Sequence, residues 1–463
     1  MRASIFSKIR VSSNLNYCKY LLMNVLNKNI NNIFFIFVIS HLIIWTVVPT
    51  IANNNLPLDV IEALAWGSNL DWGFNKHPPG SAFFPEVFYQ IFGAQDWAFY
   101  LLSSIFVVIA FIYVFRFAYE IFGNYKLSLI SVLILESIYF YNFTTPEFNV
   151  NVCQLPFWSL VVYYSWKIYN NNEIKFFDCF LIGLFAAIGF LSKYLFIYLL
   201  VSIILLFTYL IFIKKIKKFD FKYLIIIEVF IVLLIPHIVW LFSNDFITVT
   251  YGLKRTGFEE SDVLNHIQYP LTFLLKQLGT LIPFFFLIWL LVKKFKFKIN
   301  LKDKKIIFLL FINILPIFLI FLTSLITGSK IRTMWMTPFY LFFGVLFIYL
   351  FQSQIDLKKL RSFLYGFLFL FFLSPVLYSY ISISQTDKRT DYPGKQIAKK
   401  VQLTWDQDFN DPIQFVIGDE WKAGNLSYHL KSRPTWEGII DDKILNDAKE
   451  YLCVDDVCVG TYK

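Results

Sequence analysis

Eleven long apolar stretches dominate this sequence of 463 residues and constrain its fold more than any other feature. A run of about 18 apolar residues is long enough to cross the hydrocarbon core of a membrane as a helix. Charged residues make up only 16% of the chain, whereas about a quarter is usual for soluble proteins. The sequence therefore predicts an α-helical polytopic membrane protein. The expected spans are 33–51, 97–121, 127–143, 154–170, 177–191, 194–213, 222–242, 270–292, 305–327, 333–352 and 361–384.

The basic residues indicate how these spans are oriented. If the N-terminus is a cytoplasmic tail, the inner loops contain the lysine-rich clusters at 214–218, 293–298 and 358–361. The outer loops between spans contain only Lys76, Lys193, Lys254, Arg255, Lys330 and Arg332. This asymmetry follows the positive-inside rule, and with eleven spans it places the C-terminus outside. It also accounts for the net charge of +10 without a nucleic-acid partner. We expect a bacterial inner-membrane protein.

One stretch of the membrane region is ambiguous. Residues 177–213 could form one long helix, although Lys193 in the middle favours two spans that meet near the outer surface. If 177–213 were one span instead of two, every later loop would lie on the opposite side of the membrane. The lysine asymmetry therefore supports the division at Lys193.

Two regions are expected along the chain, a transmembrane domain over 1–385 and an extracytoplasmic domain over 386–463. The second region is polar, mixed in charge and contains short alternating runs, which predicts a small α/β domain docked on the membrane part. It contains Cys453 and Cys458. In an oxidising compartment these two could form a disulfide, but a pair of free thiols fits the sequence nearly as well.

The first outer loop, 53–96, concentrates ionisable residues beside two membrane-length segments. Asp59 and Glu62 are three residues apart, so both carboxylates share one face of a short helix. Lys76 and His77 follow, and the two prolines after them cannot continue a helix and favour an extended backbone at His77. The loop therefore predicts a short helix at the membrane surface, followed by a rigid turn that holds Lys76 and His77 near it.

The other outer loops add polar and charged residues on the same side of the membrane. They contribute Glu147, Asn149, Lys193, Arg255, Lys330 and Arg332. Ionisable groups at a membrane edge are costly and usually mark function. If these groups converge, they form a cavity with a carboxylate core and a cationic rim, which suits a sugar donor linked to a lipid phosphate. Cations would stabilise the leaving phosphate, and a carboxylate would deprotonate or orient the acceptor hydroxyl.

Several motifs resemble bacterial members of glycosyltransferase family 39, which are polytopic enzymes of the GT-C fold. That family is related to protein O-mannosyltransferases and to the lipid A aminoarabinose transferase. The pattern D-x-x-E-A-x-A-W-G from Asp59, followed by W-G-x-x-K-H-P-P from Trp72, is similar to the family's first extracytoplasmic loop. Shorter similarities follow in the same order at 143–151, at 191–194, in G-D-E-W-K-A-G-N at 418–425, and in Arg-Pro at 433–434.

The resemblance implies a GT-C arrangement of about eleven helices. It also implies transfer of a sugar from a polyprenyl-phosphate donor to a lipid, glycan or protein acceptor. The family's catalytic carboxylate corresponds to Asp59, and the acid of its second loop corresponds to Glu147. We expect the donor site to be formed by Lys193, Lys330 and Arg332 at the phosphate, Lys76 and His77 beside it, and Glu62, Asn149 and Arg255 in support. One departure is that the aminoarabinose branch has Glu-Lys before its two prolines, where this chain has Lys76-His77. No substrate or metal detail is transferred from that branch.

Other roles for these residues remain open. Asp59 could be only the N-cap of its helix, with Glu62 completing a capping box. Glu147 could simply begin a helix. The cations Lys193, Lys330 and Arg332 could be anchors that reach the lipid headgroups, and Arg255 could lie in a solvated loop. The carboxylates are compatible with a divalent metal, but no set of ligands is evident.

The alternative function is a polytopic transporter or lipid flippase. Such proteins commonly show inverted repeats, broken midplane helices and polar groups buried inside their spans. This sequence shows no repeat, and its ionisable groups lie at one surface. A scaffold without activity would leave the one-sided cluster of acids and bases unexplained. The sequence therefore favours an enzyme.

Overall fold

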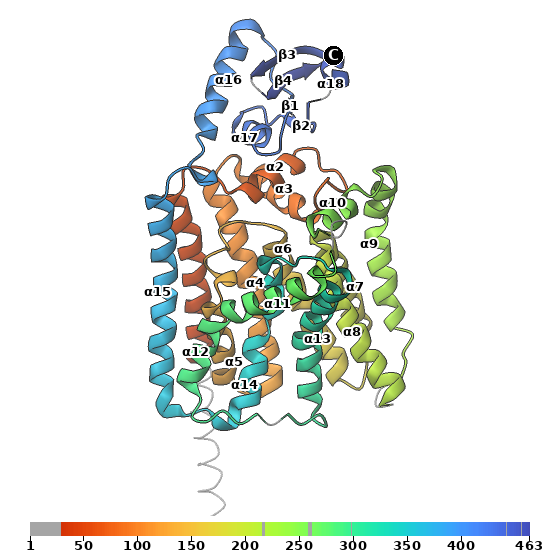
Figure 1. Ribbon diagram of the computed structural model, residues 1–463, viewed down its shortest axis with the longest axis vertical. Coiled ribbons are helices and arrows are strands. Elements are labelled where there is room, and N and C mark those ends of the chain that lie inside the picture. Colours follow the sequence, from red (N-terminus) through yellow and green to blue (C-terminus); the bar gives the residue numbers. More distant parts are fainter. Residues whose placement is uncertain (1–28, 215–217, 258–261, 298, 441, 455) are drawn as a thin grey trace, which may run out of the picture.

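The computed structural model describes residues 29–463 apart from 215–217, 258–261, 298, 441 and 455. It has a bundle of long helices with a small domain at one end (Figure 1). The predicted cytoplasmic tail at 1–28 lies outside the described residues, as do parts of the basic clusters at 215–217 and 298. The two parts meet through the first outer loop, which positions the candidate site.

Within the described residues, six helices are long and apolar enough to cross a membrane. They are Asn29–Ala52, α4 (Asp96–Phe122), Tyr194–Ile213, which includes α8 (Ile197–Thr208), α9 (Tyr223–Ser243), α13 (Lys304–Thr327) and α15 (Leu360–Ser384). Two bent pairs raise this number to eight if each pair is one span. They are α11 (Asn265–Thr280) with α12 (Ile282–Leu291), bent by 45°, and Thr333–Tyr340 with the helix that contains α14 (Phe343–Phe351), bent by 55°.

Three of the predicted spans are helical but do not meet these length and composition criteria. The first, α5 (Tyr125–Leu133), has 9 residues, about 14 Å of helix, which is half of a bilayer core of about 30 Å. The helix α7 (Phe176–Ser192) has 17 residues, and α6 (Val150–Asn170) is almost entirely buried and contains polar side chains. The number of eleven spans therefore stays a prediction. A single helix over 177–213 is excluded, because α7 ends at Ser192 and Lys193 is extended.

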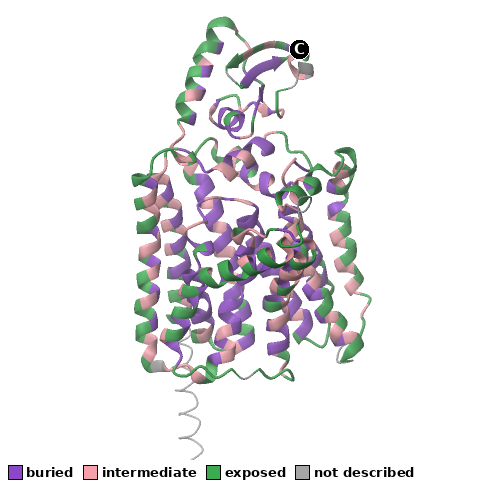
Figure 2. Ribbon diagram, viewed as in Figure 1, coloured by how far each residue is buried: buried purple, intermediate pink, exposed green. Residues whose placement is uncertain are grey.

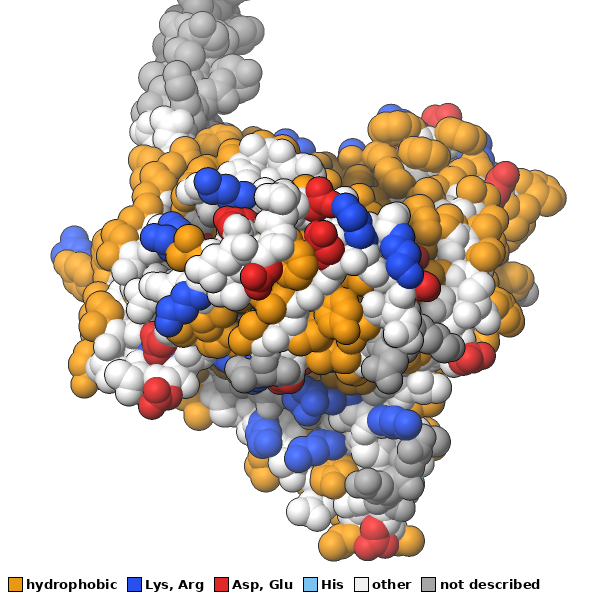
Figure 3. Space-filling model, turned by 90° about the horizontal axis from the view of Figure 1, so that it is seen from above, with side chains coloured by type: hydrophobic (Ala, Val, Ile, Leu, Met, Phe, Trp, Pro, Cys, Tyr) orange, Lys and Arg blue, Asp and Glu red, His pale blue; other side chains and the backbone are white. Residues whose placement is uncertain are grey.

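The exposure pattern identifies which helices are central and which are peripheral. In the most apolar window of α4, 67% of residues are buried, compared with 17% for α9 and α15. Buried residues gather inside the bundle, whereas α9 and α15 are largely exposed along its sides (Figure 2). Their exposed side chains are apolar, such as Phe242 and Ile383, and Figure 3 shows hydrophobic flanks around a charged central face. Apolar flanks of this kind fit a lipid environment, so the chain is an integral membrane protein.

The C-terminal part confirms the predicted small α/β domain. Its four-stranded sheet has the order β2-β1-β4-β3, in which β1 and β2 are parallel and the other neighbours are antiparallel. Cys453 and Cys458 face each other across the β3–β4 hairpin and form a disulfide. The elements are α16 (Gly394–Asp408), β1 (Phe415–Ile417), α17 (Lys422–His429), β2 (Thr435–Trp436), α18 (Asp442–Asp447), β3 (Ala448–Val454) and β4 (Val457–Tyr462).

Residues 53–96, the predicted first outer loop, form a layer between the bundle and this domain (Figure 1). They contain α2 (Leu58–Gly67) and α3 (Gly80–Phe92). One hydrophobic core combines Ala63 and Trp66 of α2 with Trp405 and Leu426 of the C-terminal domain. A Cβ atom on Gly424 of α17 would lie only 3.0–3.2 Å from atoms of α2, so a larger residue there would require α2 to shift by a few tenths of an ångström. The domain is therefore packed directly on the helix that carries Asp59.

Candidate active site

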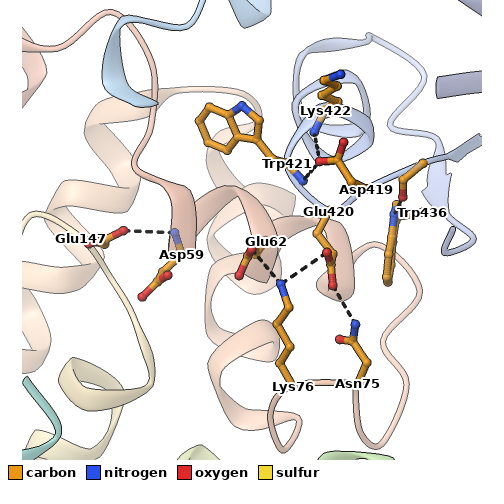
Figure 4. A network of polar contacts seen from close by, with 11 residues as sticks. Asp59, Glu62, Asn75, Lys76, Glu147, Asp419, Glu420, Trp421, Lys422 and Trp436 are labelled. Carbon is orange, nitrogen blue, oxygen red and sulfur yellow. Dashed lines mark hydrogen bonds and ion pairs between the residues drawn. The ribbon is translucent and has the colours of Figure 1, made fainter. Parts of the chain in front are cut away.

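The N-terminus of α2 is held by a carboxylate from the segment that precedes α6. Pro57 is the N-cap and Asp59 is the second helical residue. The backbone N–H of Asp59 donates a hydrogen bond to Glu147 Oε1 at 3.1 Å (Figure 4). The first N–H groups of a helix lack partners within the helix, and a negative charge there is favourable. The interpretation of Asp59 as the N-cap of a capping box is therefore wrong, because Glu147 binds this helix end and Asp59 is not its cap.

A cavity of about 570 Å³ lies beside α2. Its ionisable lining comes from four separate parts of the chain, which are the first outer loop, the α7–α8 junction, α10 (Ile247–Arg255) and the segment before Thr333. The polar and aromatic residues at its wall are Asp59, Glu62, Lys76, His77, Asn151, Lys193, Tyr194, Thr248, Tyr251, Arg255, Thr256, Arg332 and Trp335. The structure thus brings most of the sequence-predicted residues together, although their roles stay predictions.

Lys193 is the most buried cation of this cavity. It is 5% exposed, and its Nζ donates a hydrogen bond to Asn151 Oδ1 at 2.6 Å. The ammonium also lies 4.9 Å from the ring centroid of Trp335. Burial lowers the pKa of Lys193 to about 7, against the opposing effect of the Asp59 carboxylate. Its burial and its hydrogen bond to Asn151 place the Lys193 ammonium inside the cavity wall, which does not fit an anchor that reaches out to the lipid headgroups.

Asp59 is shifted in the opposite direction. Burial raises its pKa to about 7, and the charge of Glu147 adds to this effect, whereas Lys193, Lys76 and Arg255 oppose it. Burial also raises the pKa of Glu147. A carboxyl group whose pKa lies near the working pH can accept and release a proton, which is the property required of a general base.

Lys76 is held between two carboxylates (Figure 4). Its Nζ lies 2.9 Å from Glu62 Oε1 and 3.4 Å from Glu420 Oε2 of the C-terminal domain. Burial disfavours the Lys76 ammonium, but the two acids outweigh this effect and raise its pKa. His77 lies beside the Trp66 and Tyr251 rings, and burial lowers its pKa to about 3, with the neighbouring cations adding to the effect. The imidazole is therefore neutral at pH 7.

The remaining predicted residues lie in different places. Arg255 and Arg332 line the cavity and form its cationic rim, and burial lowers the pKa of Arg332. Lys330 is exposed and does not line the cavity, although its backbone N–H donates to Thr256 O at 2.8 Å. Asn149 is the N-cap of α6, where its side chain accepts two backbone hydrogen bonds. It supports the site only by fixing the start of the helix that carries Asn151.

The turn that carries Lys76 is fixed to α9 and α10 by hydrogen bonds. His237 Nδ1 pairs with Trp72 O at 2.6 Å and its Nε2 pairs with the Tyr194 hydroxyl at 2.7 Å. Thr248 donates to Phe74 O at 2.7 Å. His237 is therefore a packed polar residue that positions the loop.

Sequence reasoning missed three residues of this site. Asn151 lies within the motif at 143–151 and Trp335 lies three residues after Arg332, but neither carries a sequence signal that marks it as part of the site. Glu420 lies in the C-terminal domain, about 340 residues from Lys76, and no sequence pattern connects the two. Within the described residues, no group of three His, Cys, Asp or Glu side chains is arranged to hold a metal ion. We therefore derive no step through a metal.

Comparisons with known proteins agree with this architecture. Residues 76–240 match the family model described as dolichyl-phosphate-mannose-protein mannosyltransferase. Two crystal structures of ArnT from Cupriavidus metallidurans are similar at 12% identity. The one bound to undecaprenyl phosphate has a TM-score of 0.61 and covers 88% of this chain and 86% of that chain. The apo state has a TM-score of 0.58, with coverage of 89% and 86%. A search of curated protein sequences finds no match.

The family match includes Lys76, His77, Glu147 and Lys193 but begins after Asp59. The structural similarity extends over 88% of the chain, and it confirms the predicted fold. This chain is thus an integral membrane protein of the GT-C glycosyltransferase fold, with a segment at 76–240 that matches the dolichyl-phosphate-mannose-protein mannosyltransferase family.

Proposed function

We propose that this chain is a glycosyltransferase that moves a sugar from a polyprenyl-phosphate-linked donor to an acceptor at the outer face of the membrane. One observation carries the proposal: Asp59, with a pKa near 7, shares a cavity with Lys193, Arg255 and Arg332. The ArnT structure bound to undecaprenyl phosphate supports a carrier of the same class. The match to a family named for dolichyl-phosphate-mannose chemistry supports the same reaction type.

The proposed reaction follows from the charges in the cavity. Asp59 accepts the proton of the acceptor hydroxyl, and the oxygen forms a bond to the anomeric carbon. The bond between this carbon and the phosphate oxygen breaks, and the electron pair leaves with the polyprenyl phosphate. The phosphate gains one negative charge in this step, so Lys193, Arg255 and Arg332 stabilise the transition state more than the bound donor.

A second cavity favours an acceptor that is itself anchored in the membrane. It has a volume of about 470 Å³ and is lined by Leu58 and Glu147, and Leu58 also lines the first cavity, so the two cavities meet at the α2 N-terminus. Phe143, Pro146, Tyr378 and Ile381 form an apolar part of its wall, and the last two belong to the spanning helix α15. An amphiphile whose tail lies beside α15 could present a hydroxyl to the Asp59–Glu147 region from this side.

The rival function, a transporter or flippase, requires polar groups along a path through the spans. The cavity beside Asp59 instead collects its ionisable groups at helix ends and in the loops between helices. This distribution supports chemistry at one face of the membrane.

Mass spectrometry of the lipid, glycan and protein fractions tests the proposal. Cells that lack the gene should lose one glycosylated species, and the wild-type gene should restore it while the Asp59→Asn variant should not. The lipid fraction should contain the change if the acceptor is membrane-anchored. Identical fractions with and without the gene would contradict the proposed function.

A further inference from the structure

Glu420 is a carboxylate of the C-terminal domain that points away from its own domain and into the donor region. It lies two residues before α17, where the Asp419 side chain accepts the N–H groups of Trp421 and Lys422 at 2.9 Å each. This cap fixes the turn, and Glu420 Oε1 accepts a 2.7 Å hydrogen bond from Asn75 Nδ2. Its other oxygen lies 3.4 Å from Lys76 Nζ (Figure 4).

The C-terminal domain is also held by contacts that do not involve Glu420. Arg433 binds Glu86 at 2.5 Å and the carbonyl oxygen of Leu64 at 2.7 Å. Tyr428 donates to Asp96 at 2.7 Å, and the shared core around α2 adds apolar packing. Glu420, by contrast, faces a residue that lines the 570 Å³ cavity.

Lys76 is therefore ion-paired in the structure and is not free to bind an anion. Glu62 belongs to the same loop, but Glu420 belongs to a separate domain. A phosphate that binds Lys76 must displace at least one of these carboxylates from the ammonium. The negative charge of Glu420 also repels the phosphate. Both effects oppose binding of an anion at Lys76.

We propose that Glu420 is a positioning residue that holds Lys76 in a closed ion-paired arrangement, so that the C-terminal domain gates binding of the donor phosphate. The inference rests on the proposed function, because it assigns the donor phosphate to this cavity. When the phosphate binds, Lys76 exchanges Glu420 for the phosphate oxygens. The domain thereby acts on the reaction through a single side chain and does not contact the reacting atoms.

Binding of undecaprenyl phosphate to the full chain in nanodiscs tests the gate. Glu420→Gln removes the charge but keeps an oxygen for Asn75, so the turn is preserved. We expect its Kd to fall by about two- to fivefold, the range for one partly exposed ion pair. Asp456→Asn is the matched control, because it removes the exposed Lys422–Asp456 pair of the same domain. Its Kd should equal that of the wild type.

The same substitution in a Lys76→Met variant distinguishes the proposed gate from a general effect of the substitution on the structure. Combined with Lys76→Met, Glu420→Gln should no longer change the Kd, because Glu420 acts through Lys76. If Glu420→Gln does not fold, Glu420→Ala also removes the charge and should also bind undecaprenyl phosphate more tightly.

Three results would overturn the gate. They are an unchanged Kd, weaker binding, or the same change in the Lys76→Met background. If the wild type binds undecaprenyl phosphate but Glu420→Gln has no effect, only the gate fails. If the wild type does not bind undecaprenyl phosphate, the donor part of the proposed function fails and the gate fails with it.

Discussion

At the scale of single residues, the cavity contains an acid, Asp59, and a base, Lys193, whose pKa values are both shifted toward neutral pH. Burial disfavours charge on both Asp59 and Lys193, and it moves both pKa values to about 7 from opposite sides. Each charge partly offsets the effect of burial on the pKa of the other group. Such a pair can exchange a proton with substrate at neutral pH at little energetic cost.

The first prediction concerns the pH dependence of kcat/KM. Below pH 7, Asp59 is protonated and cannot act as a base, so the rate should rise as pH increases toward 7. Above pH 7, Lys193 loses its charge and binds phosphate less well, so the rate should fall. We therefore expect a narrow bell-shaped profile with its maximum near pH 7. Lys193→Arg stays charged at all accessible pH values and should lose the alkaline limb. A flat wild-type profile between pH 6 and 8 would contradict this assignment.

The second prediction separates catalysis from structure at Asp59. Because Glu147 binds the backbone N–H of Asp59 and not its carboxylate, Asp59→Asn leaves the α2 N-terminus intact. A general base typically contributes about 10²–10⁴-fold in rate, so the variant should accumulate normally in the membrane and lose activity by this factor. Transfer assays on membranes with matched protein levels measure it. Glu62→Gln should lose less. Activity of Asp59→Asn near that of the wild type would remove Asp59 from the mechanism.

At the scale of elements, α2 is the part on which the site depends. Its N-terminus is bound by Glu147, its middle packs against Gly424 of α17, and the residue after its end, Ser68, accepts the backbone N–H of Trp436 at 2.8 Å. Three segments that are far apart in sequence therefore fix the direction in which Asp59 points. Preorganisation of this kind keeps a catalytic group in place without motion during the reaction.

The third prediction concerns the clamp between α3 and the C-terminal domain. Arg433 is 12% exposed at its side chain and Glu86 only 4%. Removing one partner of a buried ion pair leaves an uncompensated charge and costs about 3–5 kcal/mol. Arg433→Met should therefore lower the thermal unfolding midpoint of the detergent-purified protein substantially. The double variant with Glu86→Gln should recover part of the loss, because the stranded charge is gone. An unchanged midpoint for Arg433→Met would show that the clamp does not hold the domain.

At the scale of the whole molecule, the sequence predicted the architecture better than the site. Hydropathy follows from composition, so the apolar helices and the polar C-terminal domain could be predicted. Hydropathy does not indicate where one side chain lies relative to another. Lys330 and Arg332 are two residues apart, yet only Arg332 lines the cavity. The turn at Gly328, with a φ of 65°, and the hydrogen bond from the Lys330 N–H to Thr256 determine this difference. The contact between Glu420 and Lys76 depends on domain docking, which no local pattern encodes.

The last prediction is the side of the membrane on which the site lies. The C-terminal domain and α2 are at one end of the bundle, and the loops that join α12 to α13 and α14 to α15 are at the other (Figure 1). These two loops and the adjacent helix starts contain the described basic residues Lys293, Lys294, Lys296, Lys302, Lys304, Lys305, Lys358, Lys359 and Arg361. Basic loops stay in the cytoplasm, so the domain and the cavity should be outside.

Reporter fusions measure this orientation directly. Alkaline phosphatase folds to an active enzyme only outside the cytoplasm, whereas green fluorescent protein becomes fluorescent inside it. A fusion after Lys463 should therefore give phosphatase activity and no fluorescence, and a fusion after Ile299, in the α12–α13 loop, should give the reverse. The two sites lie at opposite ends of the bundle, so the same reporter cannot be active at both. Matching results at the two sites would contradict the orientation, and with it the assignment of Asp59, Lys193 and Glu420 to the outer face.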